Sequence, residues 1–255
     1  MGIKHFLFNS TLCLHRWMAK KVNADLHMTI PRGKTIVSHR MDYDAVSPPC
    51  LERYNGLPFL DMGCTYDYVR YRALELMKEQ IENLPGSVAE LGVFEGNFAQ
   101  MINYLFPKKT LFLYDTFQGF DERDCSLEQE QQFSKEALSG DLKPLASDPI
   151  EAIRERCPYS ENLVFRKGYF PETAAPDKNE TFSFVSLDAD LYKPTHAGLE
   201  FFYPRMQEGG VIFVHDYSSG MWKGVKEAIQ DAEKIFGPFK KVPLPDCCGT
   251  LVIVK

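Results

Sequence analysis

Short apolar runs alternate with segments of helical spacing from about residue 66 onward, and this alternation limits the fold more than any other feature. Expected strands are Ser87 to Leu91, Thr110 to Tyr114, Leu163 to Arg166, Phe182 to Leu187 and Val211 to Val214. Expected helices are Tyr66 to Leu84, Gly96 to Leu105, His196 to Met206 (ended by Gly209-Gly210) and Lys223 to Ile235. Such alternation predicts parallel strands with helices on both faces of the sheet.

The end of the chain departs from this alternation. Phe239 to Pro243 and Thr250 to Val254 are strand patterns joined by a short turn, which predicts an antiparallel hairpin. Five parallel strands followed by a hairpin are the strand inventory of the class I methyltransferase (Rossmann-like) sheet, an α/β fold of seven strands. We expect this domain over residues 65–255, and an N-terminal arm or cap without a clear period over residues 1–64.

A polar, acidic stretch from Asp121 to Glu161 follows the second expected strand. Its length exceeds that of an ordinary loop between a strand and a helix, so we expect a helical insertion over the site.

Composition narrows the classes of partner. A chain of 255 residues with 44% hydrophobic content can bury a full core, and its longest apolar stretches fall far short of the roughly 20 residues that cross a bilayer. The formal net charge of −6, without a long basic stripe, argues against nucleic acid. We therefore expect a small or uncharged partner and no stable membrane insertion. Met1 to Lys21 is either a weak interfacial segment or, as we favour, a buried or oligomer-contact helix, which suggests a homo-oligomer.

The seven cysteines are irregularly spaced and lack the C-x-x-C pairs of a structural zinc site. We expect reduced thiols and a cytoplasmic protein. The vicinal Cys247-Cys248 has two interpretations, a redox pair or, as we favour, small residues in a turn.

The first expected strand runs directly into a glycine loop. This loop contains the candidate cofactor residues Glu90, Gly92, Phe94, Glu95 and Gly96. Its glycines allow a sharp turn and close approach of the backbone to a ligand, and the following helix offers free N–H groups. The G-x-x-x-G spacing differs from that of a dinucleotide loop.

The acids around this loop favour a particular cofactor. A carboxylate before the glycines suits a cationic ligand, and S-adenosylmethionine carries a sulfonium and an ammonium group. Asp115, at the end of the second strand, is placed to accept hydrogen bonds from ribose hydroxyls. The alternative is a glycine turn that only packs a helix on a strand, with surface acids nearby.

Two further acids and a histidine follow later strands. Asp188 comes directly after Phe182 to Leu187, and His215-Asp216 comes directly after Val211 to Val214. Ligands bind at the carboxyl ends of strands in open α/β sheets, so these side chains predict a divalent metal site or an acid/base centre. Asp190 would approach the substrate or orient a ligand.

Six linked motifs resemble a known family. They are VAELGVFEGNFA, LYDTFQGF, KGYFPETA, FVSLDADLY, FFYPRM-x-x-GGVIFVHDY and GVKEA, within residues 65–255. In order and spacing they resemble the macrocin, mycinamicin and novobiocin sugar O-methyltransferases, a metal-dependent group of S-adenosylmethionine enzymes. The resemblance implies methyl transfer to a hydroxyl, usually of a sugar attached to a larger molecule, and hence a small-molecule or glycan acceptor. It implies cofactor contacts from Glu90, Gly92, Glu95, Gly96, Asp115, Thr116 and Phe117, and a magnesium site at Asp188, His215 and Asp216.

The chain departs from the family at two points. The family has two acids where this chain has His215-Asp216, and imidazole suits manganese, iron or zinc better than magnesium. His215 could therefore ligate a softer metal, act as a general base, or only form a hydrogen bond at a strand end. The family also has a histidine in the insertion, whereas this chain has none between His39 and His196.

Other readings stay open at this point. The acceptor could be a catechol-like phenol, or the protein could be a catalytically silent cofactor-binding scaffold. Tyr169, Phe170 and Tyr192 follow strand ends and either stack on a ligand ring or belong to the core. His196, expected at a helix start, is more typical of a capping or surface residue than of a catalyst.

Overall fold

The computed structural model describes residues 26–32, 35–41, 68–134, 140, 142–144, 146–246 and 248–255. The chain divides into two units, residues 1–60 and 61–255. In the first unit, β1 (Leu26–Arg32) and β2 (Thr35–Met41) pair as an antiparallel hairpin that the sequence pattern did not predict. The expectations for Met1 to Lys21 and for Cys247 lie outside the described residues.

The second unit is built on a seven-stranded sheet. Its strands are β3 (Ser87–Leu91), β4 (Leu111–Asp115), β5 (Leu163–Lys167), β6 (Phe182–Leu187), β7 (Met206–Val214), β8 (Lys240–Pro243) and β9 (Leu251–Val254). They lie in the order β5-β4-β3-β6-β7-β9-β8. The first five are parallel, and β9 runs antiparallel to both β7 and β8. The predicted five parallel strands and C-terminal hairpin are confirmed.

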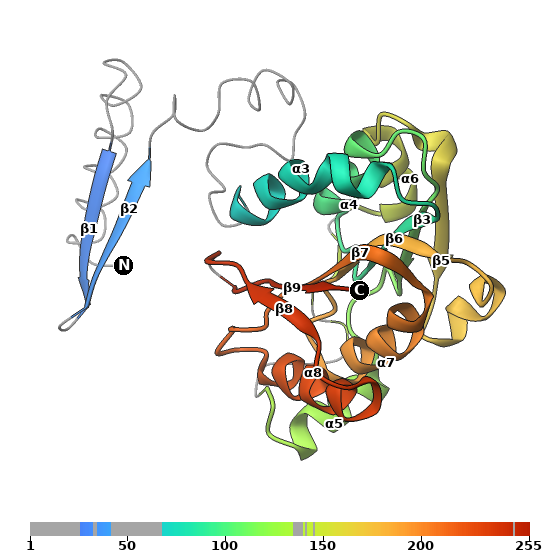
Figure 1. Cartoon of the computed structure of the whole chain (residues 1–255). Coiled ribbons are helices and arrows are strands. Elements are labelled where there is room, and N and C mark those ends of the chain that lie inside the picture. Colours follow the sequence, from blue (N-terminus) through green and yellow to red (C-terminus); the bar gives the residue numbers. More distant parts are fainter. Residues whose placement is uncertain are drawn as a thin grey trace. The chain divides into compact units, whose positions relative to one another are not determined.

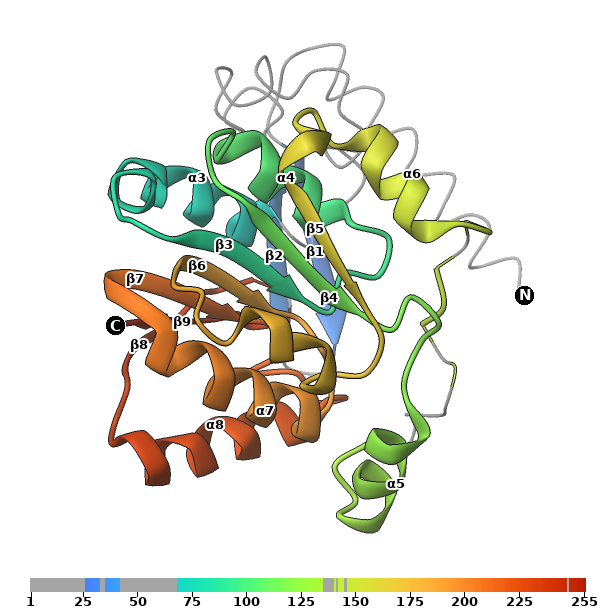
Figure 2. The same ribbon diagram turned by 90° about the vertical axis from the view of Figure 1, so that its right-hand side faces the viewer.

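Helices cover both faces of this sheet (Figures 1 and 2). One face carries α3 (Tyr68–Glu82), α4 (Asn97–Leu105) and α6 (Pro149–Arg156), and the other carries α7 (Tyr192–Phe202) and α8 (Lys223–Phe236). The segment expected to form an insertion contains α5 (Glu122–Glu130) as well as α6. In the part of the chain that the structure describes, no helix is long and apolar enough to span a membrane.

Two elements differ from the prediction by several residues, and the others by at most two residues at either end. The helix expected over His196 to Met206 begins at Tyr192 and ends at Phe202. It can begin before Pro194 because the N–H groups of the first helical turn have no partner within the helix, so a proline there removes no hydrogen bond. The glycines expected to end that helix, Gly209 and Gly210, instead lie inside β7, which begins at Met206.

A register shift in β6 distributes its aromatic side chains to both faces of the sheet. The shift falls between Phe182 and Phe184, so these residues do not share a face as they would in a regular strand. Phe182 packs against Phe202 of α7, with ring centroids 5.1 Å apart. Phe184 packs against Phe98 and Phe106 on the α4 side. One strand therefore contributes large side chains to both halves of the core.

We expect Phe184→Ala to lower the free energy of unfolding by about 3–5 kcal/mol, because it leaves a cavity among fully buried rings. Ile235→Ala, at a side chain that is 55% exposed, should cost less than about 0.5 kcal/mol. Urea unfolding of the two variants measures both values. Equal losses would contradict this account of the core.

Candidate active site

The candidate site residues lie at one level, where the parallel strands end. The N–H of Asp188 donates to Leu91 O (2.8 Å), and the N–H of His215 donates to Leu187 O (2.9 Å). Each residue after a strand thus continues the hydrogen-bond ladder to the neighbouring strand. β6 and β7 are adjacent, as the prediction for Asp188 and His215 requires.

Left-handed backbone conformations gather at these strand ends. The described non-glycine residues with positive φ are Phe94 (50°), Phe117 (54°), Gln132 (56°), Leu142 (51°), Asp190 (59°) and Asp216 (61°). Phe94, Phe117, Asp190 and Asp216 follow β3, β4, β6 and β7 respectively. This conformation costs about 1–2 kcal/mol per residue and is retained where the surrounding structure imposes it, often at functional sites.

The glycine loop is held against the end of β6. A Cβ atom on Gly92, where φ is +85°, would lie 2.0 Å from the carbonyl oxygen of Asp188. No other residue type fits at this position without moving one of the two segments. The loop after β3 and the acid after β6 are therefore positioned together.

Asp115 organises the same loop through its carboxylate. Oδ2 accepts hydrogen bonds from the N–H groups of Val93 (2.7 Å) and Phe94 (2.9 Å), and Oδ1 accepts one from Phe117 (2.6 Å). Its side chain thus ties the ends of β3 and β4 to each other.

Two adjoining cavities of about 650 and 610 Å³, measured to their open mouths, form a cleft at the strand ends. Asp115 and Thr116 line the first, Glu90 and Glu95 line the second, and both share Gly92, Phe94, Asp188 and Asp190. Gly96 and Phe117 line neither cavity: Gly96 packs against Ile153, and Phe117 is buried against Phe165.

Glu90 is a buried acid in the wall of the second cavity, with 1% of its surface exposed. Its burial, together with the nearby charge of Asp188, raises the pKa of its carboxyl well above the usual range, although Arg70 opposes this effect. Among the described residues, its Oε2 atom has no hydrogen-bond partner. A cationic ligand in this cavity would supply the missing partner.

Asp188 lies between the guanidinium of Arg70 and the imidazole of His215. Its Oδ2 is 2.5 Å from Nη1 of Arg70, which comes from α3, and its Oδ1 is 2.8 Å from Nδ1 of His215. Burial opposes ionisation of Asp188, but His215 and Arg70 together hold the pKa of its carboxyl well below the usual range. Asp188 is therefore an anion. No sequence pattern pointed to Arg70, which precedes the glycine loop by about 20 residues.

Three carboxylates converge beside this ion pair. Ligand oxygens of Asp188, Asp190 and Asp216 lie within 4.8 Å of one another. Burial raises the pKa of Asp190 well above the usual range, and the charges of Asp188 and Asp216 raise it further. Such a group of acids favours a bound proton or a bound cation. Asp190, expected only to approach the substrate or orient a ligand, is thus a candidate ligand itself.

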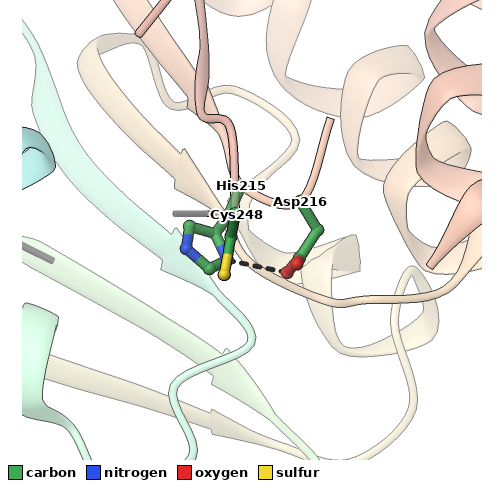
Figure 3. Close-up of side chains that lie close together, drawn as sticks. All are labelled: His215, Asp216 and Cys248. Carbon is green, nitrogen blue, oxygen red and sulfur yellow. Dashed lines mark hydrogen bonds and ion pairs between the residues drawn. The ribbon is translucent and has the colours of Figure 1, made fainter. Parts of the chain in front are cut away.

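A second group of potential ligands shares Asp216. His215, Asp216 and Cys248 present a nitrogen, an oxygen and a sulfur within 4.8 Å of one another (Figure 3). His215 Nδ1 lies 2.7 Å from Oδ2 of Asp216. Sequence reasoning missed Cys248, although antiparallel pairing of the last strand with the strand before His215 would have brought it there.

The insertion borders the cleft. Asp121 and Asp124 line the first cavity, and the hydroxyl of Tyr169 donates to Asp124 Oδ1 (2.8 Å) in the same wall. Buried Glu128 accepts a hydrogen bond from the N–H of Tyr192 (2.6 Å) and so caps α7 from α5. Hydrogen bonds therefore connect the insertion to the rest of the domain beside the cleft.

The remaining aromatic candidates divide between cleft and fold. Tyr169 and Phe170 line the first cavity, and Phe170 also packs in the core against Phe202. Tyr192 does not line either of the two adjoining cavities, and its hydroxyl donates to Asp231. His196 lies in the second turn of α7, 3.4 Å from Glu200, so it is a surface residue and not a helix cap.

The strand order, the glycine loop after β3 and the acids after β4, β6 and β7 define a protein with the class I methyltransferase fold. The family model of the macrocin O-methyltransferases (TylF) matches residues 66–244. The chain belongs to this family.

Two relatives are similar in sequence. Demethyldecarbamoylnovobiocin O-methyltransferase of Streptomyces niveus is 27% identical over 173 residues, which span 63% of this chain and 64% of the relative. The second is 8-demethyl-8-(2,3-dimethoxy-alpha-L-rhamnosyl)-tetracenomycin-C 4'-O-methyltransferase of Streptomyces olivaceus, 23% identical over 61% of each chain. The chain thus spans less than two-thirds of the length of either relative.

Solved structures share the fold. The O-methyltransferase NovP has a TM-score of 0.58 at 19% identity, covering 74% of this chain and 80% of NovP. CalS11, a calicheamicin methyltransferase, has a TM-score of 0.60 at 17% identity, covering 81% and 89% of the two chains.

We expect Gly92→Ala to destabilise the fold more than Gly209→Ala by about 1–3 kcal/mol in urea unfolding. Both glycines have positive φ, +85° and +80°, so both variants carry the cost of a left-handed alanine. Only at Gly92 would the new Cβ meet backbone, whereas at Gly209 no atom of the described residues lies within 4 Å of it. Similar losses in the two variants would show that the close approach to Asp188 is unimportant.

Proposed function

We propose that this protein is an S-adenosylmethionine-dependent O-methyltransferase that acts on a hydroxyl of a sugar, glycan or glycosylated metabolite and uses a divalent cation. The observation that carries the proposal is the convergence of Asp188, Asp190, Asp216 and His215 beside a cleft walled by the glycine loop. Membership of the macrocin O-methyltransferase family supports the reaction type.

The acceptor class rests on the relatives. The Streptomyces olivaceus enzyme is named for a rhamnosyl-bearing tetracenomycin, and the other relative is named for demethyldecarbamoylnovobiocin. Neither relative favours the catechol-like phenol. The intact acids of the cleft argue against a catalytically silent scaffold. A homo-oligomeric state and a cytoplasmic location stay predictions from the sequence.

S-adenosylmethionine supplies the methyl group as a sulfonium donor. The unpartnered oxygen of Glu90 suits the ammonium at the amino-acid end of this cofactor. Asp115, in the other part of the cleft, suits the ribose hydroxyls, and its bonds to Val93 and Phe94 keep the glycine loop in place. Gly92 and Phe94 border both parts of the cleft.

The three-carboxylate group fits a hard divalent cation. Asp188, Asp190 and Asp216 would hold Mg²⁺ or Mn²⁺, for which oxygen ligands are preferred. Burial first, and then the charges of Asp188 and Asp216, raise the pKa of Asp190, and such a cation would offset the repulsion among these acids. When bound, it would lower the pKa of an acceptor hydroxyl and orient its oxygen.

His215 is suited to act as the general base. Its Nδ1 atom faces carboxylate oxygens of Asp188 (2.8 Å) and Asp216 (2.7 Å), so the proton of a neutral imidazole belongs on Nδ1. The lone pair then lies on Nε2, which can accept the hydroxyl proton. Asp188 and Asp216 would orient the ring and stabilise it once it is protonated.

We expect Asp115→Ala to weaken S-adenosylmethionine binding by at least about tenfold, because it removes charge-assisted hydrogen bonds and loosens the loop. Calorimetric titration measures the affinity. Asp148→Ala is the matched control, because Asp148 also accepts a backbone N–H, at the start of α6, without lining either part of the cleft. Unchanged affinity in Asp115→Ala would refute the cofactor assignment.

We expect the metal-stripped chain to bind Mn²⁺, and Asp188→Asn and Asp216→Asn each to weaken this binding on the order of 10²-fold. Loss of a side chain that binds the metal directly should weaken metal binding at least as much as loss of a side chain that only orients a ligand. Electron paramagnetic resonance of free Mn²⁺ measures the binding without an acceptor. Methyl transfer to a panel of glycosides should stop in excess chelator.

Glu151→Gln, at an exposed acid of α6, serves as the control for lost negative charge. Full turnover in excess chelator would move the protein to the metal-independent methyltransferases.

A further inference from the structure

Cys248 lies in the turn between β8 and β9, yet it faces the end of β7. The sulfur of Cys248, a nitrogen of His215 and an oxygen of Asp216 lie within 4.8 Å of one another, and the three side chains point toward a common centre (Figure 3). This mixed set is chemically different from the three carboxylates, although both sets share Asp216.

The sheet itself brings the two segments together. Antiparallel pairing of β7 with β9 places Val214 opposite Leu251, so residues just after β7 lie beside residues just before β9. The N–H of Ser218 donates to Cys248 O (3.3 Å). A Cβ on Gly249, where φ is +73°, would lie 2.4 Å from Cβ of Ser218, so this approach requires glycine. Backbone contacts on both sides of Cys248 therefore hold its thiol near His215.

The distances suit a single small ion. Two atoms bound to one Zn²⁺ can be at most about 4.4 Å apart, the sum of a Zn–S and a Zn–N bond of about 2.3 and 2.1 Å. Side chains whose ligand atoms already lie within 4.8 Å need only small rotations to meet this limit. Thiolate and imidazole ligands favour Zn²⁺ and Co²⁺ over Mg²⁺, which prefers oxygen.

We propose that His215, Asp216 and Cys248 form a binding site for a soft divalent cation of the Zn²⁺ or Co²⁺ class. Binding would form a metal–sulfur bond and release the thiol proton to solvent. Three protein ligands leave one position of a tetrahedral ion for solvent. This proposal does not depend on methyl transfer. A soft ion at this site would, however, bind the imidazole of His215, which the proposed function assigns as the general base.

The test is a Co²⁺ titration of the full, reduced and metal-stripped chain. A cysteine thiolate bound to Co²⁺ produces a near-ultraviolet charge-transfer absorption that oxygen and nitrogen ligands do not. We expect this band in the wild-type chain and its loss in Cys248→Ser, together with at least about a tenfold weaker affinity for Co²⁺. Cys125→Ser and Cys157→Ser, at buried thiols outside the mixed set, should keep the band.

Asp188→Asn separates this proposal from the catalytic one. It should keep the cobalt–thiolate band, because Asp188 is outside the mixed set, while losing most of the Mn²⁺ binding described above. Thermal unfolding of Cys248→Ser, which differs from wild type in one atom, verifies that the fold is retained. Co²⁺ binding without a thiolate band, no Co²⁺ binding at all, or a band that survives in Cys248→Ser would overturn the proposal.

Discussion

Parallel pairing of β3, β6 and β7 in a common register is the constraint on which the site depends. Leu91 lies beside Leu187, and Leu187 lies beside Val214, so the next residue of each strand emerges at the same level. Three segments distant in sequence thereby deliver the glycine loop, Asp188 and His215 to one place. The buried apolar runs of these strands provide the stability, and the polar residues that follow them provide the chemistry.

Much of the sheet could be predicted because its central strands are continuous apolar runs bounded by polar residues. The bounds of β3 and β6 agree with the prediction residue for residue. The start of β7 could not be predicted, because Gly209 and Gly210 are also typical of a helix end. A helical pattern likewise does not distinguish a proline in the first turn, such as Pro194, from one that precedes the helix.

The candidate site was predictable only where it follows the sheet. Asp188 and His215 lie together because each directly follows a strand, which the sequence reveals. Arg70 comes from a helix whose packing over the strand ends leaves no local signature, so its ion pair with Asp188 could not be foreseen. Cys248 required the pairing of β9 with β7, a tertiary contact that spacing alone does not specify.

Residues with left-handed backbone conformations follow four neighbouring strands, and they affect both the stability of the fold and the binding of ligands. The surrounding fold imposes strained backbone conformations on Phe94, Phe117, Asp190 and Asp216, so the cost of shaping these loops belongs to folding and not to association. Glycine at any of them would relieve strain while widening the range of loop shapes. Attempts to make this protein more heat-resistant should therefore spare these positions, because gains in melting temperature there would come at the expense of readiness to bind.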